Sequence, residues 1–191
     1  MKVSRLFSII AVLMIALFVF SCAHAFEPKK KPRPEISIPW LEKQIHDLVN
    51  LERKKKGLSA LAWNQKLSAI ARKHSADMAE KNYFSHYSPE GKDFLYRYEQ
   101  AGFQCNIRIG NGIYLGGENI FQANLYDTVT YVNGAAYYDW NTEADIANQV
   151  VRGWMNSALH RKNILTPHWN TEGIGISISA DGMVFVTQNF C

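Results

Sequence analysis

The chain has 191 residues, of which 47% are hydrophobic, and it carries a formal net charge of +4. This length predicts a single domain with a substantial core. Residues 1–35 hold six basic and two acidic side chains, so they account for the whole net charge, and residues 36–191 are neutral overall. A neutral domain argues against electrostatic capture of nucleic acid, and we expect no such partner.

The N-terminus has the three parts of a secretory signal peptide. A basic start is followed by an apolar run over residues 6–20 and by the cleavage motif Ala23-His24-Ala25. We therefore predict a signal peptide over residues 1–25 and a secreted protein, extracellular or in the cell envelope. The run is shorter than the ~18 residues of a usual membrane span, so we expect no transmembrane helix in the mature chain. The alternative is a lipoprotein acylated at Cys22, which the bulky Phe20 fits poorly.

Residues 26–39 are predicted to be a linker before a domain over residues 40–191. The part from Glu27 to Pro34 contains three prolines and four basic residues, which is typical of an extended tether. We expect it to be solvated, although such a segment could also touch an anionic wall or membrane surface.

Two cysteines remain after cleavage, Cys105 and Cys191. In an oxidising compartment an even pair suggests a disulfide, which would tie the middle of the chain to its last residue. The alternative is two unpaired thiols, because a sequence does not show how far apart the two Cα atoms lie.

Helical spacing of apolar residues and capping signals predict four helices. Asn64 is a good N-cap for the second, and Thr142 can form a capping box with Asp145 at the start of the fourth. Gly57 and Gly102 follow the first and third as terminators. The predicted ranges are 40–56, 65–81, 92–101 and 143–155.

Two histidines lie on the first two predicted helices. His74 falls on the apolar face of the second, so we expect a hydrogen-bonded core residue rather than a ligand. His46 is expected at the surface.

Near the C-terminus the hydrophobic period changes from that of a helix to that of a strand. Residues 174–178 alternate isoleucine with glycine or serine, Asp181-Gly182 is a strong hairpin signal, and Met183–Phe190 is the predicted return strand. Helices followed by such strands predict an α+β domain with helices packed on an antiparallel sheet.

Residues 121–141 are rich in tyrosine and contain an Asn133-Gly134 turn. One interpretation is an aromatic rim for a lipid, sugar or peptide. The other, which we favour slightly, is a short hairpin that packs its aromatic side chains on the body of the domain.

Three segments form an unusual set: Phe84-Ser85-His86, Gly117-Glu118-Asn119-Ile120, and residues 154–165 with sequence WMNSALHRKNIL. Together with residues 48–53, 173–175 and 186–190, this set resembles a bacterial member of the CAP superfamily. That superfamily comprises cysteine-rich secretory proteins, antigen 5 and pathogenesis-related 1 proteins. The resemblance covers about Leu41 to Cys191. It implies an α–β–α sandwich with a central antiparallel sheet and a solvent-exposed cleft.

In that family two histidines and two acidic residues commonly line the cleft. The resemblance puts His86, Glu118 and His160 at three of these positions and Ser157 at the fourth, where animal and plant members usually carry glutamate. With one carboxylate fewer, hard cations should bind weakly. The pair His86 and His160 would suit a zinc-like divalent metal with open, water-filled positions.

The residues themselves point partly the same way. Ser157 and His160 are three positions apart, so on one helix they would face one cavity. Glu118 could accept a hydrogen bond from an imidazole and set its tautomer. The alternative for His86, Glu118 and His160 is a buried polar network with a purely structural role.

The sequence leaves two candidate functions. The first is a secreted binding module whose unknown extracellular ligand is a lipid, a wall fragment or a protein. The second is a metal-assisted, peptidase-like hydrolase, with His86, Glu118 and His160 as candidate catalytic residues. We favour the first, because residue 157 is not acidic and no nucleophile motif is visible.

Overall fold

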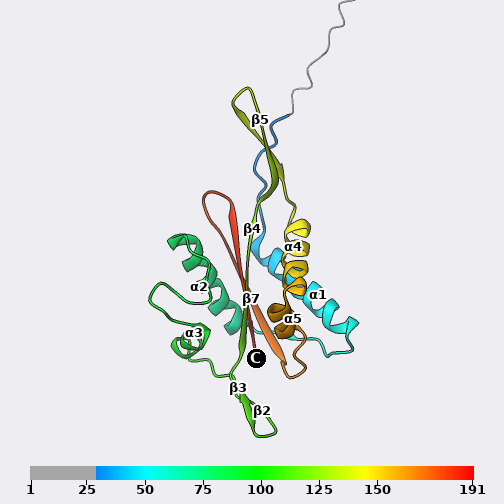
Figure 1. Ribbon diagram of the computed structural model, residues 1–191, viewed down its shortest axis with the longest axis vertical. Helices are drawn as coiled ribbons and strands as arrows, with labels where there is room; N and C mark the ends of the chain where they lie inside the picture. The colour runs from blue at the N-terminus through cyan, green and yellow to red at the C-terminus, as the bar shows by residue number, and fades with distance from the viewer. Residues whose placement is uncertain (1–28) are drawn as a thin grey trace, which may run out of the picture.

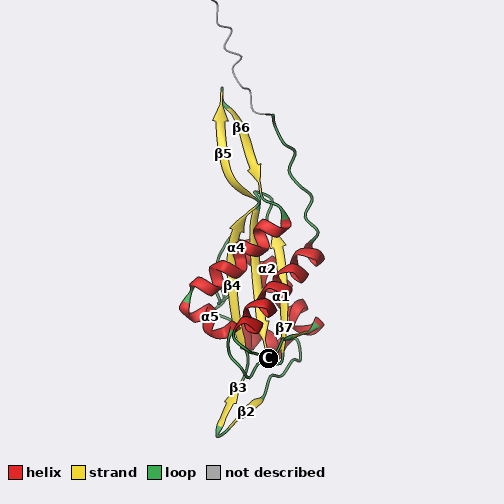
Figure 2. Cartoon of the chain, turned by 90° about the vertical axis from the view of Figure 1, so that its right-hand side faces the viewer, coloured by secondary structure: helices red, strands yellow, loops and turns green. Residues whose placement is uncertain are grey.

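A computed structural model describes residues 29–191, so the predicted signal peptide and Cys22 lie outside the described residues. Two layers of helices enclose a central sheet, with α2 and α3 on one side and α1, α4 and α5 on the other (Figure 1, Figure 2). The helices are α1 (Ile38–Lys55), α2 (Gln65–Lys81), α3 (Phe94–Gln100), α4 (Glu143–Asn156) and α5 (Ala158–Ile164). Within residues 29–191, none of the helices has the length and apolar character to cross a bilayer.

The strands form one central sheet and two separate hairpins. They are β1 (Ala62–Trp63), β2 (Ile107–Ile109), β3 (Gly112–Tyr114), β4 (Gly117–Asn124), β5 (Tyr126–Val132), β6 (Ala135–Trp140), β7 (Thr171–Ile178) and β8 (Met183–Phe190). The central order is β1-β7-β8-β4. β7, β8 and β4 are antiparallel neighbours, as expected, whereas the short β1 runs parallel to β7 and makes the sheet mixed.

The predicted starts of α2 and α4 are confirmed by their caps. The Asn64 side chain accepts hydrogen bonds from two backbone N–H groups of α2, and Thr142 and Asp145 form the capping box of α4. α3 is shorter than predicted because Asp93 caps it, so that it begins at Phe94. These side chains hold backbone donors that a helix cannot satisfy itself.

Glycines in β7 let α2 approach the sheet closely. A Cβ atom on Gly173 would lie 2.1 Å from the backbone nitrogen of Ser68, and one on Gly175 would lie 1.9 Å from that of Arg72. Ser75 of α2 uses this closeness, because its hydroxyl donates to the carbonyl oxygen of Gly175 at 2.8 Å. The Gly-Ile-Gly segment of the family motif is therefore a packing requirement.

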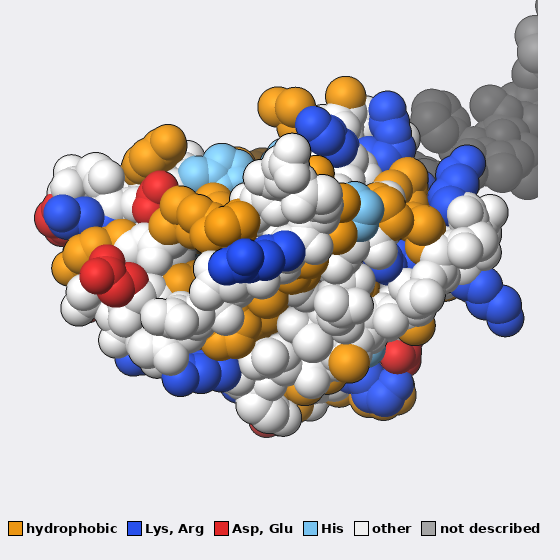
Figure 3. Space-filling model, turned by 90° about the horizontal axis from the view of Figure 1, so that it is seen from below, with side chains coloured by type: hydrophobic (Ala, Val, Ile, Leu, Met, Phe, Trp, Pro, Cys, Tyr) orange, Lys and Arg blue, Asp and Glu red, His pale blue; other side chains and the backbone are white. Residues whose placement is uncertain are grey.

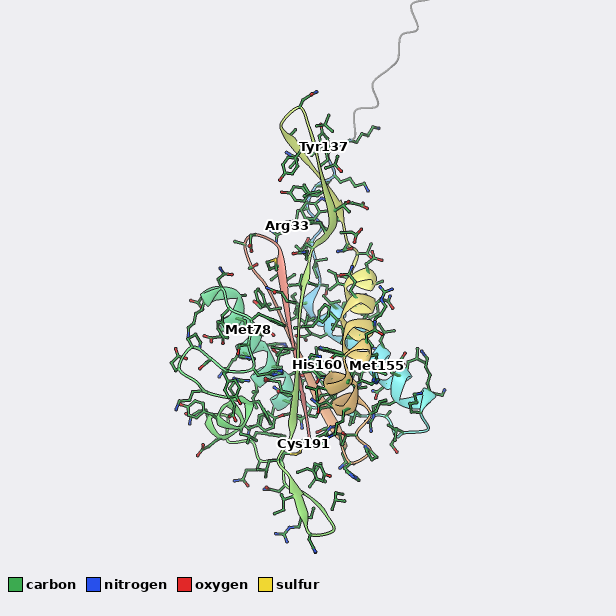
Figure 4. All side chains as sticks on the ribbon, in the orientation of Figure 1. Arg33, Met78, Tyr137, Met155, His160 and Cys191 are labelled. Carbon is green, nitrogen blue, oxygen red and sulfur yellow. A yellow bond between two sulfur atoms is a disulfide. The ribbon has the colours of Figure 1, made fainter. Side chains whose placement is uncertain are left out.

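The predicted disulfide is confirmed. Cys105 and Cys191 are bonded, with their Cα atoms 5.5 Å apart. Hydrogen bonds also hold the backbone of Cys191 to Thr171 in both directions, at 2.9 and 2.7 Å. The last residue is thus fixed by one covalent bond and by the edge of β7, close to the lower end of the sheet (Figure 4).

Residues 121–141 include the expected hairpin, formed by β5 and β6 around the Asn133-Gly134 turn. It projects beyond the sheet rather than lying on the body (Figure 2). Its aromatic side chains pack mainly on each other: Tyr138 and Trp140 stack with ring centroids 4.7 Å apart. Of the β5 and β6 side chains, only Trp140 also packs against the core, so the hairpin was predicted correctly but its packing was not.

The segment before α1 is exposed but runs alongside this hairpin. The Trp140 indole donates to the carbonyl oxygen of Lys31 at 3.0 Å, and Arg33 donates to that of Ala180 at 2.9 Å. The proline-rich stretch therefore has fixed contacts as well as solvent exposure.

Candidate functional site

The candidate site lies at the outer edge of β4. Side chains alternate along a strand, so neighbours point to opposite faces of the sheet. Glu118 contacts Arg97 of α3, whereas Asn119 contacts the carbonyl oxygen of His160 in α5. The cleft therefore draws residues from both helical layers, which meet around the β4 edge. Figure 4 shows His160 beside this strand, near the middle of the molecule.

His86 and Glu118 form a directed pair. Nδ1 of His86 lies 2.9 Å from Oε1 of Glu118, whose side chain is 1% exposed. Arg97 donates from Nη2 to the other carboxylate oxygen at 2.7 Å. Since a carboxylate only accepts, Nδ1 carries the proton and Nε2 of His86 remains free to accept. Glu118 thus orients His86, and both of its oxygens are already engaged.

His160 faces this pair from α5. Its ring centroid is 6.3 Å from that of His86, with the two planes tilted by 40°. Burial, and next repulsion from His86 when that ring is protonated, lower the pKa of His160 below its ordinary value. Its ring forms no hydrogen bond within residues 29–191, so it offers a neutral imidazole nitrogen at neutral pH.

Ser157 is placed differently from the prediction. It ends α4 and precedes α5 with extended backbone angles (φ −87°, ψ 124°), so it shares no helical face with His160. Its hydroxyl makes no capping bond and, in the described part of the chain, none to His86, Glu118 or His160. The three titratable groups are brought together, whereas the serine stands at the joint between two helices.

The free edge of β4 is covered by side chains. Trp154 donates from its indole to the carbonyl oxygen of Ile120 at 3.0 Å, and Asn163 donates to that of Glu118 at 3.1 Å. Both residues belong to the WMNSALHRKNIL segment, which therefore fixes α4 and α5 onto the strand. This fixation sets the position of His160 relative to His86.

Exposed apolar side chains flank the two histidines in sequence. Phe84 is 45% exposed, Tyr87 58% and Leu159 76%. Seen from below, hydrophobic side chains and histidines adjoin on the surface (Figure 3). The sequence neighbours of the two histidines therefore supply exposed apolar groups.

A metal site here would have few protein ligands. Among residues 29–191, no group of three or more His, Cys, Asp or Glu side chains is arranged to hold an ion. The donor set is limited to the two imidazoles, because Glu118 is occupied by His86 and Arg97.

The histidine predictions had mixed outcomes. His74 is 2% exposed, and its Nε2 lies 3.0 Å from the carbonyl oxygen of Ser85, which confirms a core role. The surface prediction for His46 was wrong: its side chain is 16% exposed, with Nδ1 2.6 Å from Oε1 of Glu172. Asn50 occupies its other nitrogen at 3.2 Å.

Sequence reasoning also missed Arg97, the residue that completes the site. An arginine on a short amphipathic helix is ordinarily a surface residue, so nothing local marked it. Its position next to Glu118 depends on how α3 packs at the edge of β4.

The fold and this group of residues at the edge of the sheet are those of a CAP-type domain. The chain belongs to the cysteine-rich secretory protein (CAP) family, whose model matches residues 46–190. The family prediction is therefore confirmed.

Two proteins of Bacillus subtilis are similar over most of the chain. YlbC, described as a membrane protein, is 34% identical over 149 residues, which cover 78% of this chain and 34% of YlbC. YkwD is 33% identical over 139 residues, covering 73% of this chain and 43% of YkwD. The chain therefore spans less than half the length of these relatives.

Solved structures share the fold. An extracellular SCP-domain protein of Bacillus anthracis is 32% identical with a TM-score of 0.57, covering 80% of this chain and 40% of that one. An outer surface protein of Borrelia burgdorferi is 16% identical with a TM-score of 0.59, covering 83% of this chain and 97% of that one. The predicted α+β sandwich is thereby confirmed.

Proposed function

We propose that this protein is an extracellular binding module whose cleft recognises its ligand through His86 and His160. The observation that carries the proposal is the directed His86–Glu118 pair. A buried carboxylate holds one ring nitrogen, which leaves the other free to accept in a partly exposed ring. The exposed apolar side chains beside the two histidines in sequence, called here the apolar rim, would supply contact area, and the two imidazoles would supply orientation.

An extracellular place is supported by the predicted signal peptide and by the disulfide. The similar Bacillus anthracis and Borrelia proteins are an extracellular and an outer surface protein, respectively. A lipid, a wall fragment or a protein partner could each present apolar groups to the rim.

Binding fits this geometry better than hydrolysis. A hydrolase of the Ser–His type needs a hydroxyl held against the base. In the described part of the chain, no hydroxyl hydrogen-bonds to the ring of His86 or His160. The free nitrogens of the two rings are instead proposed to bind a polar group of an external ligand.

A zinc-like ion fits the cleft as an accessory to binding. His86 and His160 would hold it, and water or the ligand would complete its coordination. When bound, such an ion would act as a Lewis acid toward an oxygen of the ligand. The fold relative NaASP2 has been crystallised with Zn2+.

Calorimetric titration of zinc into residues 26–191 tests this metal role. We expect micromolar binding that is lost in His86→Ala/His160→Ala and kept in the control His168→Ala. Absence of binding, or binding that survives the double substitution, would reject a metal in the cleft.

Co-sedimentation with purified peptidoglycan sacculi or phospholipid vesicles tests the binding role itself. The variant Leu159→Asp changes a side chain that is 76% exposed, so the fold should be retained. We expect retention on one of the two probes and at least tenfold weaker retention for the variant. Equal retention of both proteins would show that the cleft is not the contact surface.

A further inference from the structure

Residues of α2 and α3 line a concave region of the surface. These two helices form the layer opposite α4 and α5 (Figure 1). The concave region consists of two adjoining hollows, of about 300 and about 440 Å3. Both are lined by Lys73, Tyr96 and Arg97, so they form one continuous feature, called here the α2–α3 groove. Neither cleft histidine lines it.

The smaller hollow combines an apolar wall with positive charge. Ile70, Tyr96 and Ala101 line it together with Lys66, Lys73 and Arg97, and no acidic side chain does. A ligand of complementary chemistry has an anionic group attached to a compact apolar body. The volume of about 300 Å3 lies at the small end of ligand pockets, so this hollow suits a compact apolar body.

The lysines that line the two hollows differ in whether they have an acidic partner. In the larger hollow Lys81 is paired with both Asp77 and Glu90. Lys73, by contrast, is exposed and has no ion pair or hydrogen bond within residues 29–191.

Arg97 adds a donor that the fold leaves unused. Its Nη1 and Nη2 groups donate to the carbonyl oxygens of Lys92 and His86 and to Glu118. Its Nε is buried and has no partner in the described part of the chain. Buried guanidinium donors are normally satisfied, so this one is available after a small shift of a side chain that already lines the groove.

We propose that the α2–α3 groove binds a small organic carboxylate, with the carboxylate at Lys73 and Arg97 and the apolar body against Ile70 and Tyr96. A carboxylate matches both a lysine ammonium and a single guanidinium N–H donor, which at Arg97 is Nε. The groove shares Arg97 with the histidine site through Glu118, but its proposed ligand does not depend on the function proposed for that site.

Two-dimensional NMR titration of residues 26–191 with 4-phenylbutyrate tests this proposal. The matched probe is 4-phenylbutylamine, which has the same apolar body and the opposite charge. We expect the carboxylate to shift the resonances of groove residues with millimolar or better affinity, and the amine to leave them unchanged. Equal binding of both probes, or of neither, would overturn the proposal.

Variants separate a local site from general attraction of anions. Lys73→Glu should weaken carboxylate binding at least tenfold, whereas Lys54→Glu makes the same charge change at an unpaired position on α1 and should not. An equal loss in both variants would contradict a local site. A third variant, Ala69→Phe, fills the groove from an exposed position and should also abolish binding.

The carboxylate could belong to a free acid or to the end of a peptide chain. A tripeptide ending in phenylalanine, compared with 4-phenylbutyrate, distinguishes these sources. Its C-terminal amide is the control that lacks the carboxylate. Tighter binding of the free tripeptide than of 4-phenylbutyrate assigns a peptide end, and the reverse order assigns a free acid.

Discussion

The protein contains two histidine–glutamate pairs of similar geometry and different accessibility. In one, Nδ1 of His46 lies 2.6 Å from Glu172, and in the other, Nδ1 of His86 lies 2.9 Å from Glu118. Both carboxylates are fully buried. The rings differ, because the His46 side chain is 16% exposed and the His86 side chain 42%.

The difference lies in the second ring nitrogen. Asn50 donates to Nε2 of His46, and its own amide is held by both backbone groups of Leu61. The His46 pair is therefore closed on itself. The His86 pair has no such partner for Nε2 in the described residues and instead faces His160. A histidine–carboxylate pair thus indicates a binding site only where the second nitrogen is left free.

The largest expected effect comes from removing the buried carboxylate of either pair. Glu118→Ala leaves Arg97 without its countercharge. Glu172→Ala removes a negative charge that stabilises the charged form of buried Arg53. Each should lower the free energy of unfolding by about 3–5 kcal/mol, the usual cost of breaking a buried pair. Urea unfolding measures it, with exposed Glu99→Ala as a control expected to change little. A loss below about 1 kcal/mol, the range of an exposed pair, would contradict this role.

The histidines should separate the two pairs. His46→Ala removes one hydrogen-bond partner from buried Glu172 and one from Asn50, so we expect a loss of about 2–3 kcal/mol in unfolding free energy. His86→Ala leaves Glu118 bound to Arg97 and should cost about 1 kcal/mol or less. Zinc binding should show the reverse order. If both variants unfold at the same urea concentration, the distinction between a closed and an open pair fails.

A smaller effect concerns pH at the open pair. Burial lowers the pKa of His160 in the folded protein, so the unfolded chain binds more protons below about pH 6.5. The stability contributed by neutral His160 is present above that pH and is lost as the pH falls through this range. Burial also lowers the pKa of His74, which acts in the same direction.

Urea unfolding at pH 7.5 and 5.5 measures this dependence. His160→Gln should lose less stability on acidification than the wild type, because one of the two groups is gone. An unchanged pH dependence in this variant would show that His160 takes no part.

Local signals were enough for much of the fold. Asn64, Thr142 and Asp145 act through bonds within a few residues, and Asp181-Gly182 closes its hairpin as its turn chemistry predicts. The Cys105–Cys191 bond followed from an even cysteine count in a chain predicted to be secreted. Such features can be predicted from the sequence because their physical causes lie within a few residues along the chain or in the oxidising nature of the expected compartment.

The missed features depend on contacts between distant segments. His46 is buried by Glu172, 126 positions away, and Arg97 meets Glu118 only because α3 packs beside β4. The motifs placed His86, Glu118 and His160 in one region, but they could not show that Glu118 has no oxygen to spare. Ser157 was misplaced because its spacing from His160 suggested one helical face, whereas the backbone at Ser157 is extended.

The covered edge of β4 has a consequence for how partners and neighbours can attach. An open strand edge invites another chain to add a strand, whether as a ligand or as the start of an aggregate. Trp154 and Asn163 already use the outward carbonyl groups of Ile120 and Glu118, and Asn141 uses that of Asn124. Strand addition at this edge is therefore blocked. A ligand of the proposed site would therefore be recognised by side chains, and copies of the protein would not polymerise through this edge.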